Sequence, residues 1–393
     1  MSLRLVAICA LGLEEFLQEE LKALGIAQTK AGRGAVTFQG RWPDVWRTNW
    51  QLRTANRVLV ELGRWAAPED DHLYTGARAL VEDRTRRWDG LAAGRLFAPD
   101  RTIAIHATST ASVVRDTRWV ALKTKDGLVD GQRKRFGRRA SIDRKRPDLP
   151  LRVWLHKDRA SLLLDTSGEP LDRRGYRRAT GVAPLRETMA AACVLASGWD
   201  GRGPVVDPMC GTGTLLAEAA WFALRRPAGW ARGAAGTGWA FERFPGFDRA
   251  AFAAIQRGTS ETDRPDLSLW GIDRSPEAVS AAGENLERAG LADIARVQRG
   301  DAFEFKPPNS PGLVILNPPY GERIDEDAAQ WRRVGDLLKQ SYAGWKAVVL
   351  AGGESRGKQI GLRPRRRIAV RNGPLDVRIL PFDLYRGTQS GVA

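Results

Sequence analysis

The first 165 residues show two kinds of hydrophobic spacing. Segments with every second residue apolar predict strands, and segments with apolar residues three or four apart predict helices. The clearest helix covers Leu13–Leu24 and stops before Gly25. The predicted strands are Leu3–Cys9, Ala35–Gln39, Arg57–Leu62, Thr102–Ala107, Leu151–His156 and Ala160–Asp165. Other helices are expected to start at Trp42 and to span Leu73–Arg87 and Arg118–Gln132. This order indicates an α+β module.

From about Gly175 onward, apolar strands alternate with helices. The predicted strands are Gly203–Asp207, Ser268–Asp273, Ala295–Arg299, Gly312–Asn317 and Ala347–Ala351. The predicted helices are Arg186–Ser197, Thr214–Leu224, Pro276–Ala289 and Ala328–Ser341. Such alternation favours an open, mostly parallel α/β sheet. Two last strands, Arg366–Val370 and Val377–Pro381, predict a hairpin that adds an antiparallel edge.

Composition narrows the class of protein. The 393 residues are 43% hydrophobic and 27% charged, which is typical of a globular chain of two or three domains. No apolar run reaches the roughly 18 residues of a membrane span, and we expect no secretory signal at the start. The three cysteines, Cys9, Cys193 and Cys210, lie far apart, which excludes a disulfide framework and a four-cysteine zinc site. We therefore expect a cytoplasmic protein without a metal.

The chain is basic, with 62 Lys and Arg against 46 Asp and Glu and a net charge of +16. The excess is concentrated, with +8 in residues 101–150 and +6 in residues 351–393. Arginine pairs well with phosphate, so nucleic acid is the first partner to consider, although a solvated basic face remains an alternative. The residues expected to contact an RNA backbone are Arg133, Lys134, Arg135, Arg138, Arg139, Arg144, Lys145 and Arg146.

A glycine turn follows the first strand of the second unit, in GPVVDPMCGTGTLLAEAA (203–220). The strand ends at Asp207, and Gly211 and Gly213 let a ligand approach the backbone closely. The following helix offers unpaired N–H groups at its start. No lysine follows as in a P-loop, and Leu216 replaces the third glycine of a dinucleotide fingerprint. The turn indicates a nucleotide-type site of another kind.

Two further acids end neighbouring strands. Asp273 is placed to accept ribose hydroxyls, and Asp301 to meet an adenine amine. Either acid alone is more often a helix cap than a ligand. Together with Asp207, they predict a crevice at one edge of the sheet that binds an adenosine-containing cofactor.

The fourth strand runs into a proline corner, in GLVILNPPYGER (312–323). Consecutive prolines stiffen the turn and remove backbone donors. The Asn317 side chain and the Pro318 carbonyl are two acceptors that suit an exocyclic amine with two hydrogens. Tyr320 can stack on the base. The alternative is a turn that merely ends the strand, with Tyr320 packed. We favour transfer of a group to an amine.

Together these motifs resemble class I S-adenosyl-L-methionine-dependent methyltransferases that act on amino groups. The whole chain resembles the THUMP-domain RNA guanine-N2 methyltransferases, above all the bacterial branch that acts on large-subunit ribosomal RNA; a related branch acts on tRNA. The resemblance rests on residues 155–192, DPMCGTGTLLAEAA, NPPYGER and NGPLD (372–376). NPPY alone also occurs in DNA adenine and protein glutamine methyltransferases.

The resemblance implies a fold and a domain order. The fold is a Rossmann-like α/β methyltransferase domain, mostly parallel with an antiparallel edge strand, behind an α+β ferredoxin-like/THUMP module. The implied domains are a ferredoxin-like segment (1–42), a THUMP RNA-binding domain (43–166), a linker (167–185) and the methyltransferase domain (186–393). Some relatives carry a second, fused methyltransferase domain.

The resemblance also implies residue roles. The residues implied to bind S-adenosyl-L-methionine are Asp207, Pro208, Cys210, Gly211, Gly213, Thr214, Asp273, Asp301 and Asn317. Asn317, Pro318 and Tyr320 would present the target amine. Glu187 and Thr188 would lie near the methionine end.

Several choices stay open from the sequence. Cys210 is either a small packing residue, which we favour, or a nucleophile. Aromatic residues in the insertion 225–265 either pack, which we favour, or line the target-base site; they are Trp230, Trp239, Phe241, Phe244 and Phe247. The partner is ribosomal RNA or tRNA, with DNA adenine, protein glutamine and a non-enzymatic RNA scaffold as alternatives. The oligomeric state is open.

Overall fold

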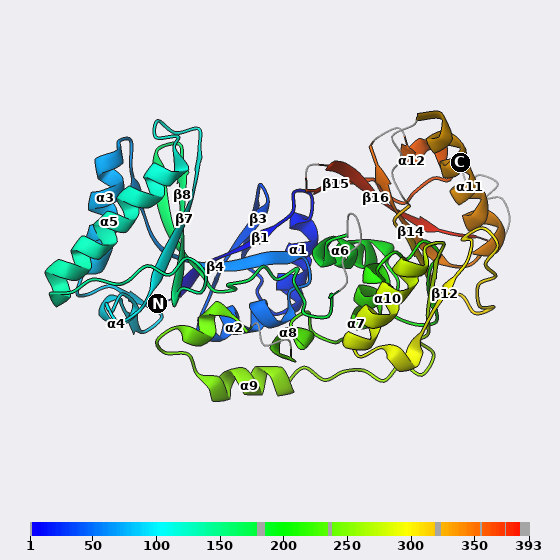
Figure 1. The fold of residues 1–393 in the computed structure, drawn as a ribbon, viewed down its shortest axis with the longest axis horizontal. Coiled ribbons are helices and arrows are strands. Elements are labelled where there is room, and N and C mark those ends of the chain that lie inside the picture. Colours follow the sequence, from blue (N-terminus) through cyan, green and yellow to red (C-terminus); the bar gives the residue numbers. More distant parts are fainter. Residues whose placement is uncertain are drawn as a thin grey trace.

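The computed structural model describes residues 2–178, 185–234, 238–318, 324–353, 356–373 and 375–385. Two sheets dominate the chain (Figure 1), one built from the blue to cyan first part and one from the green to red second part. The mixed α/β fold class predicted from the sequence is confirmed.

The first sheet has seven strands in the order β2-β3-β1-β4-β9-β8-β7. In chain order they are β1 (Leu3–Cys9), β2 (Thr29–Gly32), β3 (Ala35–Gly40), β4 (Ala55–Ala66), β7 (Ile103–Thr110), β8 (Leu149–His156) and β9 (Arg159–Asp165). Neighbours are antiparallel except β7 and β8. The first half of β4 pairs with β1 and its second half with β9, so one strand joins both halves of the sheet.

Helices cover this sheet. They are α1 (Glu14–Ala23), α2 (Trp42–Gln51), α3 (Asp70–Glu82), α4 (Ala93–Leu96) and α5 (Thr117–Phe136), and a small hairpin of β5 (Arg87–Trp88) and β6 (Leu91–Ala92) lies between α3 and α4. Helix α5 is capped at its start by Asp116, whose carboxylate accepts the N–H of Arg118, and at its end by Gly137 in the left-handed conformation. Its Gly127 lies against the Tyr74 carbonyl of α3, so the two helices pack closely.

The second sheet has the order β12-β11-β10-β13-β14-β16-β15. Its strands are β10 (Val205–Asp207), β11 (Leu269–Asp273), β12 (Ala295–Arg299), β13 (Leu313–Leu316), β14 (Lys346–Gly352), β15 (Ile368–Asn372) and β16 (Leu375–Asp383). The first five in this order are parallel, and β16 and β15 form the antiparallel edge. Helices α6 (Glu187–Ser197), α7 (Thr214–Ala223), α10 (Pro276–Arg288), α11 (Ile324–Ser341) and α12 (Arg356–Gln359) accompany it, with the 3₁₀ turn η2 (Ala292–Ile294).

The insertion 225–265 forms α8 (Trp230–Ala234), the 3₁₀ turn η1 (Ala240–Arg243) and α9 (Arg249–Arg257). Trp239, Phe241 and Phe252 pack edge-on or stacked against one another, and Trp50 of α2 joins them at 5.9 Å from Trp239. The predicted packing role is confirmed for Trp239, Phe241 and Phe244, which are buried, and for Phe247, whose ring lies 5.5 Å from that of Phe241. Trp230 differs, since it is 37% exposed beneath the guanidinium of Arg226.

The two halves of the chain share one core. A single cluster of buried apolar residues extends from the first sheet to one face of the second. A second contact lies at the edge strand, where Arg371 N donates to the Leu11 carbonyl at 3.0 Å. A Cβ on Gly12 would lie 2.0 Å from the Ala369 carbonyl oxygen, so no larger residue fits there. The domains are therefore packed as one body.

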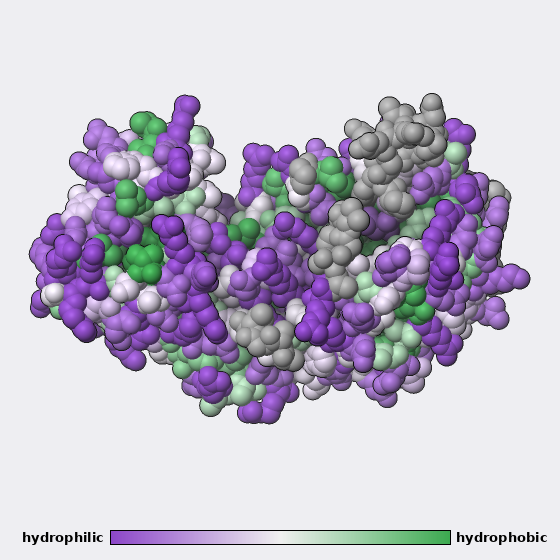
Figure 2. Space-filling model, viewed as in Figure 1, coloured by the Kyte–Doolittle hydropathy of each residue, from purple (hydrophilic) through white to green (hydrophobic). Residues whose placement is uncertain are grey.

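The visible surface is mostly hydrophilic, with small apolar patches (Figure 2). In the described part of the chain, no helix is long and apolar enough to cross a membrane.

Candidate functional site

The glycine turn lies between the end of β10 and the start of α7, as predicted. Gly211 and Gly213 have φ angles of 50° and 77°, a conformation that favours glycine. A Cβ on Gly213 would lie 3.3 Å from the Cβ of Ala282 in α10, whereas a Cβ on Gly211 would meet nothing within 4 Å. Close helix packing therefore accounts for Gly213, and ligand approach at Gly211 stays a prediction.

Asp207 and Asp273 shape this turn from two neighbouring strands. Asp273 accepts the N–H of Gly211 at 2.9 Å and that of Ser275 at 3.0 Å. Asp207 is almost completely buried and accepts the N–H of Met209 at 3.1 Å. Burial, and secondly the charge of Asp273, raise the pKa of Asp207 to about 8. The Asp207 carboxyl therefore favours its neutral form while Asp273 holds the turn.

Asp301 lies at the end of the next strand, β12. Its carboxylate accepts the N–H of Phe303 at 3.0 Å and pairs with Arg274 at 2.8 Å. The Phe303 N–H first, and Arg274 as well, hold the pKa of Asp301 below its usual range. Asp301 is therefore ionised and fixed, with its predicted contact to a ligand untested.

Asp273 and Asp301 line the same cleft, which has a volume of about 580 Å³. Pro208 of the glycine turn also lines it. Phe303 and Arg333 close one side, with the guanidinium 3.9 Å from the ring centroid. The structure thus places Asp273 and Asp301, the residues predicted to bind ribose and adenine, in one cleft. Phe303 and Arg333 also line this cleft and were not predicted from the sequence.

The proline corner begins at the same edge of the sheet. Strand β13 pairs with β10 on one side and β14 on the other, and Asn317 and Pro318 follow its last residue. Since parallel strands end at a common edge, Asn317 and Pro318 lie near the level of Asp207 and the glycine turn. Tyr320 lies outside the described residues.

Cys210 and Thr214 are both buried. The Cys210 sulfur faces Gly271 of β11, where an added Cβ would come within 3.1 Å of it. Burial raises the pKa of the Cys210 thiol well above its ordinary value, which does not suit a nucleophile and favours packing. The Thr214 hydroxyl accepts a hydrogen bond from Arg177 at 2.8 Å.

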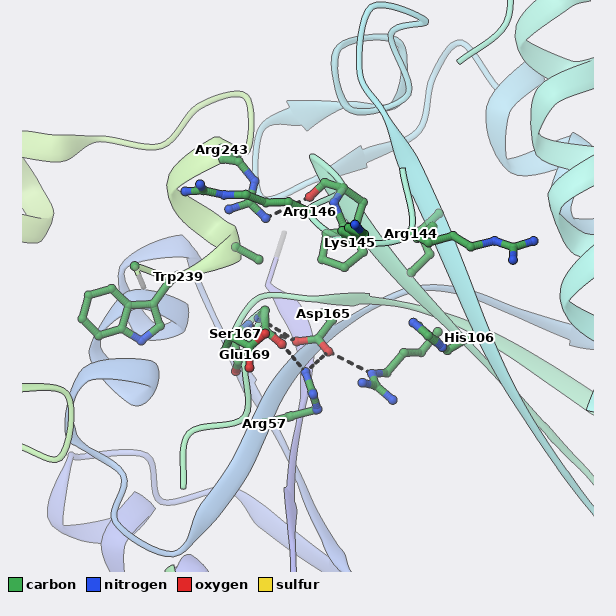
Figure 3. Close-up of a pocket in the computed structure, with 18 residues that line it drawn as sticks. Arg57, His106, Arg144, Lys145, Arg146, Asp165, Ser167, Glu169, Trp239 and Arg243 are labelled. Atoms are coloured by element: carbon green, nitrogen blue, oxygen red, sulfur yellow. Dashed lines mark hydrogen bonds and ion pairs between the residues drawn. The ribbon is translucent and has the colours of Figure 1, made fainter. Parts of the chain in front are cut away.

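The predicted RNA-binding residues separate into two groups. In the last turn of α5, Arg133 pairs with Asp130 at 3.0 Å and Lys134 with Glu82 at 2.9 Å. Arg135 donates to the Val81 carbonyl at 2.6 Å. The second group makes no ion pair with a described residue and is exposed; it comprises Arg138, Arg139, Arg144, Lys145 and Arg146. The last three line a pocket together with Arg57 (Figure 3).

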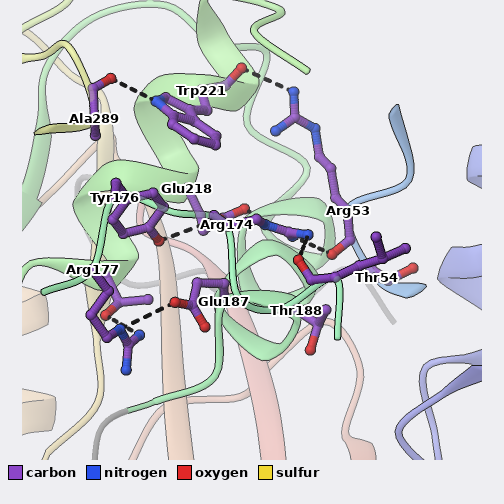
Figure 4. Close-up of polar contacts among 12 residues, drawn as sticks. Arg53, Thr54, Arg174, Tyr176, Arg177, Glu187, Thr188, Glu218, Trp221 and Ala289 are labelled. Carbon is purple, nitrogen blue, oxygen red and sulfur yellow. Dashed lines mark hydrogen bonds and ion pairs between the residues drawn. The ribbon is translucent and has the colours of Figure 1, made fainter. Parts of the chain in front are cut away.

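A buried polar network connects the linker to the turn (Figure 4). Arg177 donates to Thr214 and pairs with Glu187 of α6 at 3.1 Å. Burial raises the pKa of Glu187 to about 7 despite that partner. Thr188 donates to Asn56 at 3.1 Å, which ties α6 to β4.

A second buried pair lies beside it. Arg174 contacts Glu218 of α7 at 3.2 Å, and Tyr176 donates to the same carboxylate at 3.3 Å. This pair was not predicted from the sequence, although Glu218 is the one charged residue of TLLAEAAWFA in α7. A lone acid in an apolar helix was the available signal, because such an acid needs a buried partner.

Family models match three successive parts of the chain. Residues 4–59 match the RlmL ferredoxin-like domain, residues 71–165 the THUMP domain, and residues 174–380 the RMKL-like methyltransferase domain.

Curated relatives agree with these matches. A Synechocystis protein named as an RNA methyltransferase is 34% identical over 384 residues, covering 96% of each chain. The ribosomal RNA large subunit methyltransferase K/L of Pseudomonas aeruginosa is 36% identical over 388 residues, which cover 95% of this chain and 51% of that one. This chain thus spans about half the length of the K/L relatives.

Solved structures give the same result. SMU.472, named as a methyltransferase and complexed with SAH, is 26% identical with a TM-score of 0.85, over 98% of this chain and 99% of that one. A Listeria monocytogenes protein described as a predicted N6-adenine-specific DNA methylase is 27% identical with a TM-score of 0.84, over 99% and 97%.

The family match, the sheet order and the SAH-bound relative identify the cofactor as S-adenosylmethionine. The chain belongs to the RMKL-like methyltransferase family, with ferredoxin-like and THUMP domains preceding the catalytic domain.

Proposed function

We propose that this enzyme transfers a methyl group from S-adenosylmethionine to the exocyclic N2 amine of a guanosine in 23S ribosomal RNA. The observation that carries the proposal is the position of Asn317-Pro318 at the sheet edge that also holds the glycine turn. A THUMP domain packed on the same body supplies an RNA-binding module.

The proline corner would hold the amine by two acceptors, the Asn317 side chain and the Pro318 carbonyl. Holding both hydrogens directs the nitrogen lone pair toward the sulfonium methyl group. The amine would then attack the methyl carbon in line as the C–S bond breaks and S-adenosylhomocysteine leaves, and the methylated nitrogen would afterwards lose a proton to solvent. Positioning of the amine and its hydrogen bonds would account for the rate acceleration, and no covalent intermediate with Cys210 is required.

The acids of the cleft would hold the adenosine part of the cofactor. Each carboxylate oxygen can accept about two hydrogen bonds, so Asp273 can accept ribose hydroxyls while it holds Gly211 and Ser275. Asp301 would contact the adenine amine. Pro208, Cys210, Gly213 and Thr214 would form the walls of the turn, and Glu187 and Thr188 would lie near the methionine end.

Ribosomal RNA as substrate is supported by the K/L relatives, whose names state that activity. The Listeria description favours DNA adenine as a second candidate. The three free, buried cysteines agree with the expected cytoplasmic location, which stays a prediction.

The test is methylation of 23S rRNA, tRNA and duplex DNA by the purified protein with labelled cofactor, followed by nucleoside mass spectrometry. We expect N2-methylguanosine from 23S rRNA. N6-methyladenosine from DNA alone would replace the proposal with the second candidate, and N2-methylguanosine from tRNA alone would move the substrate to tRNA.

A further inference from the structure

A second pocket, of about 330 Å³, lies between the THUMP strands, the loop after α5 and the insertion of the methyltransferase domain (Figure 3). Its volume is that of roughly ten waters, enough for a phosphate group and its hydration. Among the residues that the structure describes, two carboxylates line it, against six cationic side chains: Arg57, Arg144, Lys145, Arg146, Arg152 and Arg243.

The two carboxylates do not balance these charges. Asp165 accepts from Arg57 at 2.6 Å and from Arg152 Nε at 2.9 Å, and its other oxygen accepts two backbone N–H groups. The second carboxylate, Glu169, pairs with Arg173 at 2.5 Å. The terminal amino groups of Arg152 make no hydrogen bond or ion pair with a described residue, so this guanidinium keeps donors for a ligand.

The insertion forms the opposite wall. Arg243 donates from Nη2 to the Pro147 carbonyl at 2.8 Å, which fixes the loop that carries Lys145 and Arg146. The Nε of Arg243 is buried and has no hydrogen-bond partner in the described part of the chain. Burial first, and the charge of Arg146 second, lower the pKa of Arg243. Like charges held together in this way repel one another unless an anion lies between them.

We propose that this pocket binds a backbone phosphate of the RNA substrate and anchors the RNA away from the reacting base. The inference rests on the proposed function, because the RNA supplies the phosphate. In Figure 1, β7 and β8 lie at the opposite end of the molecule from α11. A phosphate contact there sets the position of the RNA without reading its sequence.

His106 offers a direct reporter of occupancy. It lines the pocket and is the register partner of Arg152 across β7 and β8. Burial, then Arg152 and Arg57, lower its pKa, so an anion bound beside these arginines should raise it again. The chain has only three histidines, and His72 and His156 do not line the pocket. Their NMR signals serve as internal references.

The first experiment compares the double variant Arg152→Gln/Lys145→Gln with the control Lys157→Gln/Arg159→Gln. The control removes two exposed charges from the β8–β9 hairpin outside the pocket. For the pocket variant we expect about a tenfold higher KM for RNA, and unchanged cofactor affinity. The slope of log affinity against log salt should fall by about one to two. The control should keep the wild-type slope, and equal slopes in both variants overturn the proposal.

The second experiment titrates His106 by NMR with inorganic phosphate and with a fragment of 23S rRNA. A rise in its pKa with RNA, absent in the pocket variant, supports the proposal. A response to phosphate but not to RNA overturns the RNA source and leaves a site for a free phosphate compound. Wild-type methylation of RNA is measured in parallel, so failure of the proposed function is separate from failure of the pocket.

Discussion

The acidic residues at the carboxyl edge of the second sheet differ in their hydrogen bonds and in their burial. Asp273 and Asp301 both hold backbone N–H groups, and the pKa of Asp301 lies below its usual range, whereas Asp207 is buried and favours its neutral form. The sequence predicted where these acids lie but not their partners, because Gly211 and Arg274 reach them only across neighbouring strands. Asn317 follows β13 as predicted, and its chemistry is the most direct test of the reaction.

Replacing Asn317 by Ala removes the proposed side-chain acceptor. We expect methyl transfer to fall by at least about 100-fold, comparable to the loss of one transition-state hydrogen bond, and cofactor affinity, measured by calorimetry, to fall far less than methyl transfer. Asn317→Asp keeps an acceptor and should retain more activity than the Ala variant. Full turnover by Asn317→Ala would contradict the role.

The variant Asp207→Asn tests whether the Asp207 carboxyl is neutral in the folded protein. The folded protein holds the Asp207 proton up to about pH 8, against 3.8 for the ordinary carboxyl. Between these values the folded state binds more protons than the unfolded state, so the stabilising contribution is complete at low pH and is lost as pH rises toward 8.

The cofactor-free wild type should therefore lose stability relative to Asp207→Asn by up to about 1.4 kcal/mol per pH unit. Urea unfolding of both proteins at pH 5, 6.5 and 8 measures this difference. The effect of Glu187, whose pKa is also raised, cancels between them. A difference that does not change with pH would show that Asp207 is ionised throughout.

At the scale of elements, every strand of the second sheet and its antiparallel edge were predicted from the sequence, because most of these strands are apolar and bounded by turns. Strand β12, with the sequence ARVQR, was predicted as well although it is largely polar and exposed. The elements missed from the sequence include β2, α9 and the short β5, β6, α4, α8 and α12. Strand β2 is short, polar and exposed, so it lacks an apolar pattern. Helix α9 is amphipathic, but it is only nine residues long and buries only Phe252. The domain boundary at residue 42 remains a prediction.

Helix α5 packs on α3 through glycine. A Cβ on Gly127 would lie 2.2 Å from the Tyr74 carbonyl oxygen, whereas a Cβ on Gly283 in α10 would meet nothing within 4 Å. Gly127→Ala should therefore destabilise the protein by about 1–3 kcal/mol. Gly283→Ala should stabilise it by up to about 1 kcal/mol through helix propensity. Denaturant unfolding measures both, and equal effects would contradict the close helix contact.

The end of α5 also refines the RNA-binding prediction. Because Arg133 and Lys134 already pair with carboxylates, neutralising Arg138 and Arg139 should reduce the salt dependence of RNA binding more than neutralising the first two. Filter-binding titrations over a range of salt concentrations give both slopes. Equal salt-dependence slopes for the two variants would indicate that Arg133 and Lys134 contact RNA as well.

At the scale of the whole molecule, the insertion binds the two halves together. Trp50 of α2 packs on Trp239 and Phe252, and its indole N–H donates to Thr259 at 3.1 Å. The sequence favoured packing for these aromatics but could not show that the packing partner lies almost 200 residues away.

Trp50→Ala should lower the free energy of unfolding by about 3–5 kcal/mol. It should also divide thermal unfolding into two transitions, one for each half of the chain. Trp230→Ala is the matched control, because Trp230 belongs to the same insertion but packs on Trp221 and Arg226 within the methyltransferase domain. Calorimetry of both variants decides the question. A single transition in Trp50→Ala would mean that the remaining core suffices to couple the halves.

Strand β4 fixes the spacing between the ferredoxin-like and THUMP parts of the enzyme. One end of β4 pairs with β1 and the other with β9. The distance between the ferredoxin-like and THUMP parts therefore depends on the number of residues in one extended strand and not on a hinge. The two pairings overlap at Leu59 and Val60, so the two parts share residues of this strand. Two extra residues after Val60 would keep the alternation of the strand but should move the later THUMP strands by about 7 Å relative to β1. The position of the RNA, and with it the nucleotide that is methylated, would then depend on the length of β4.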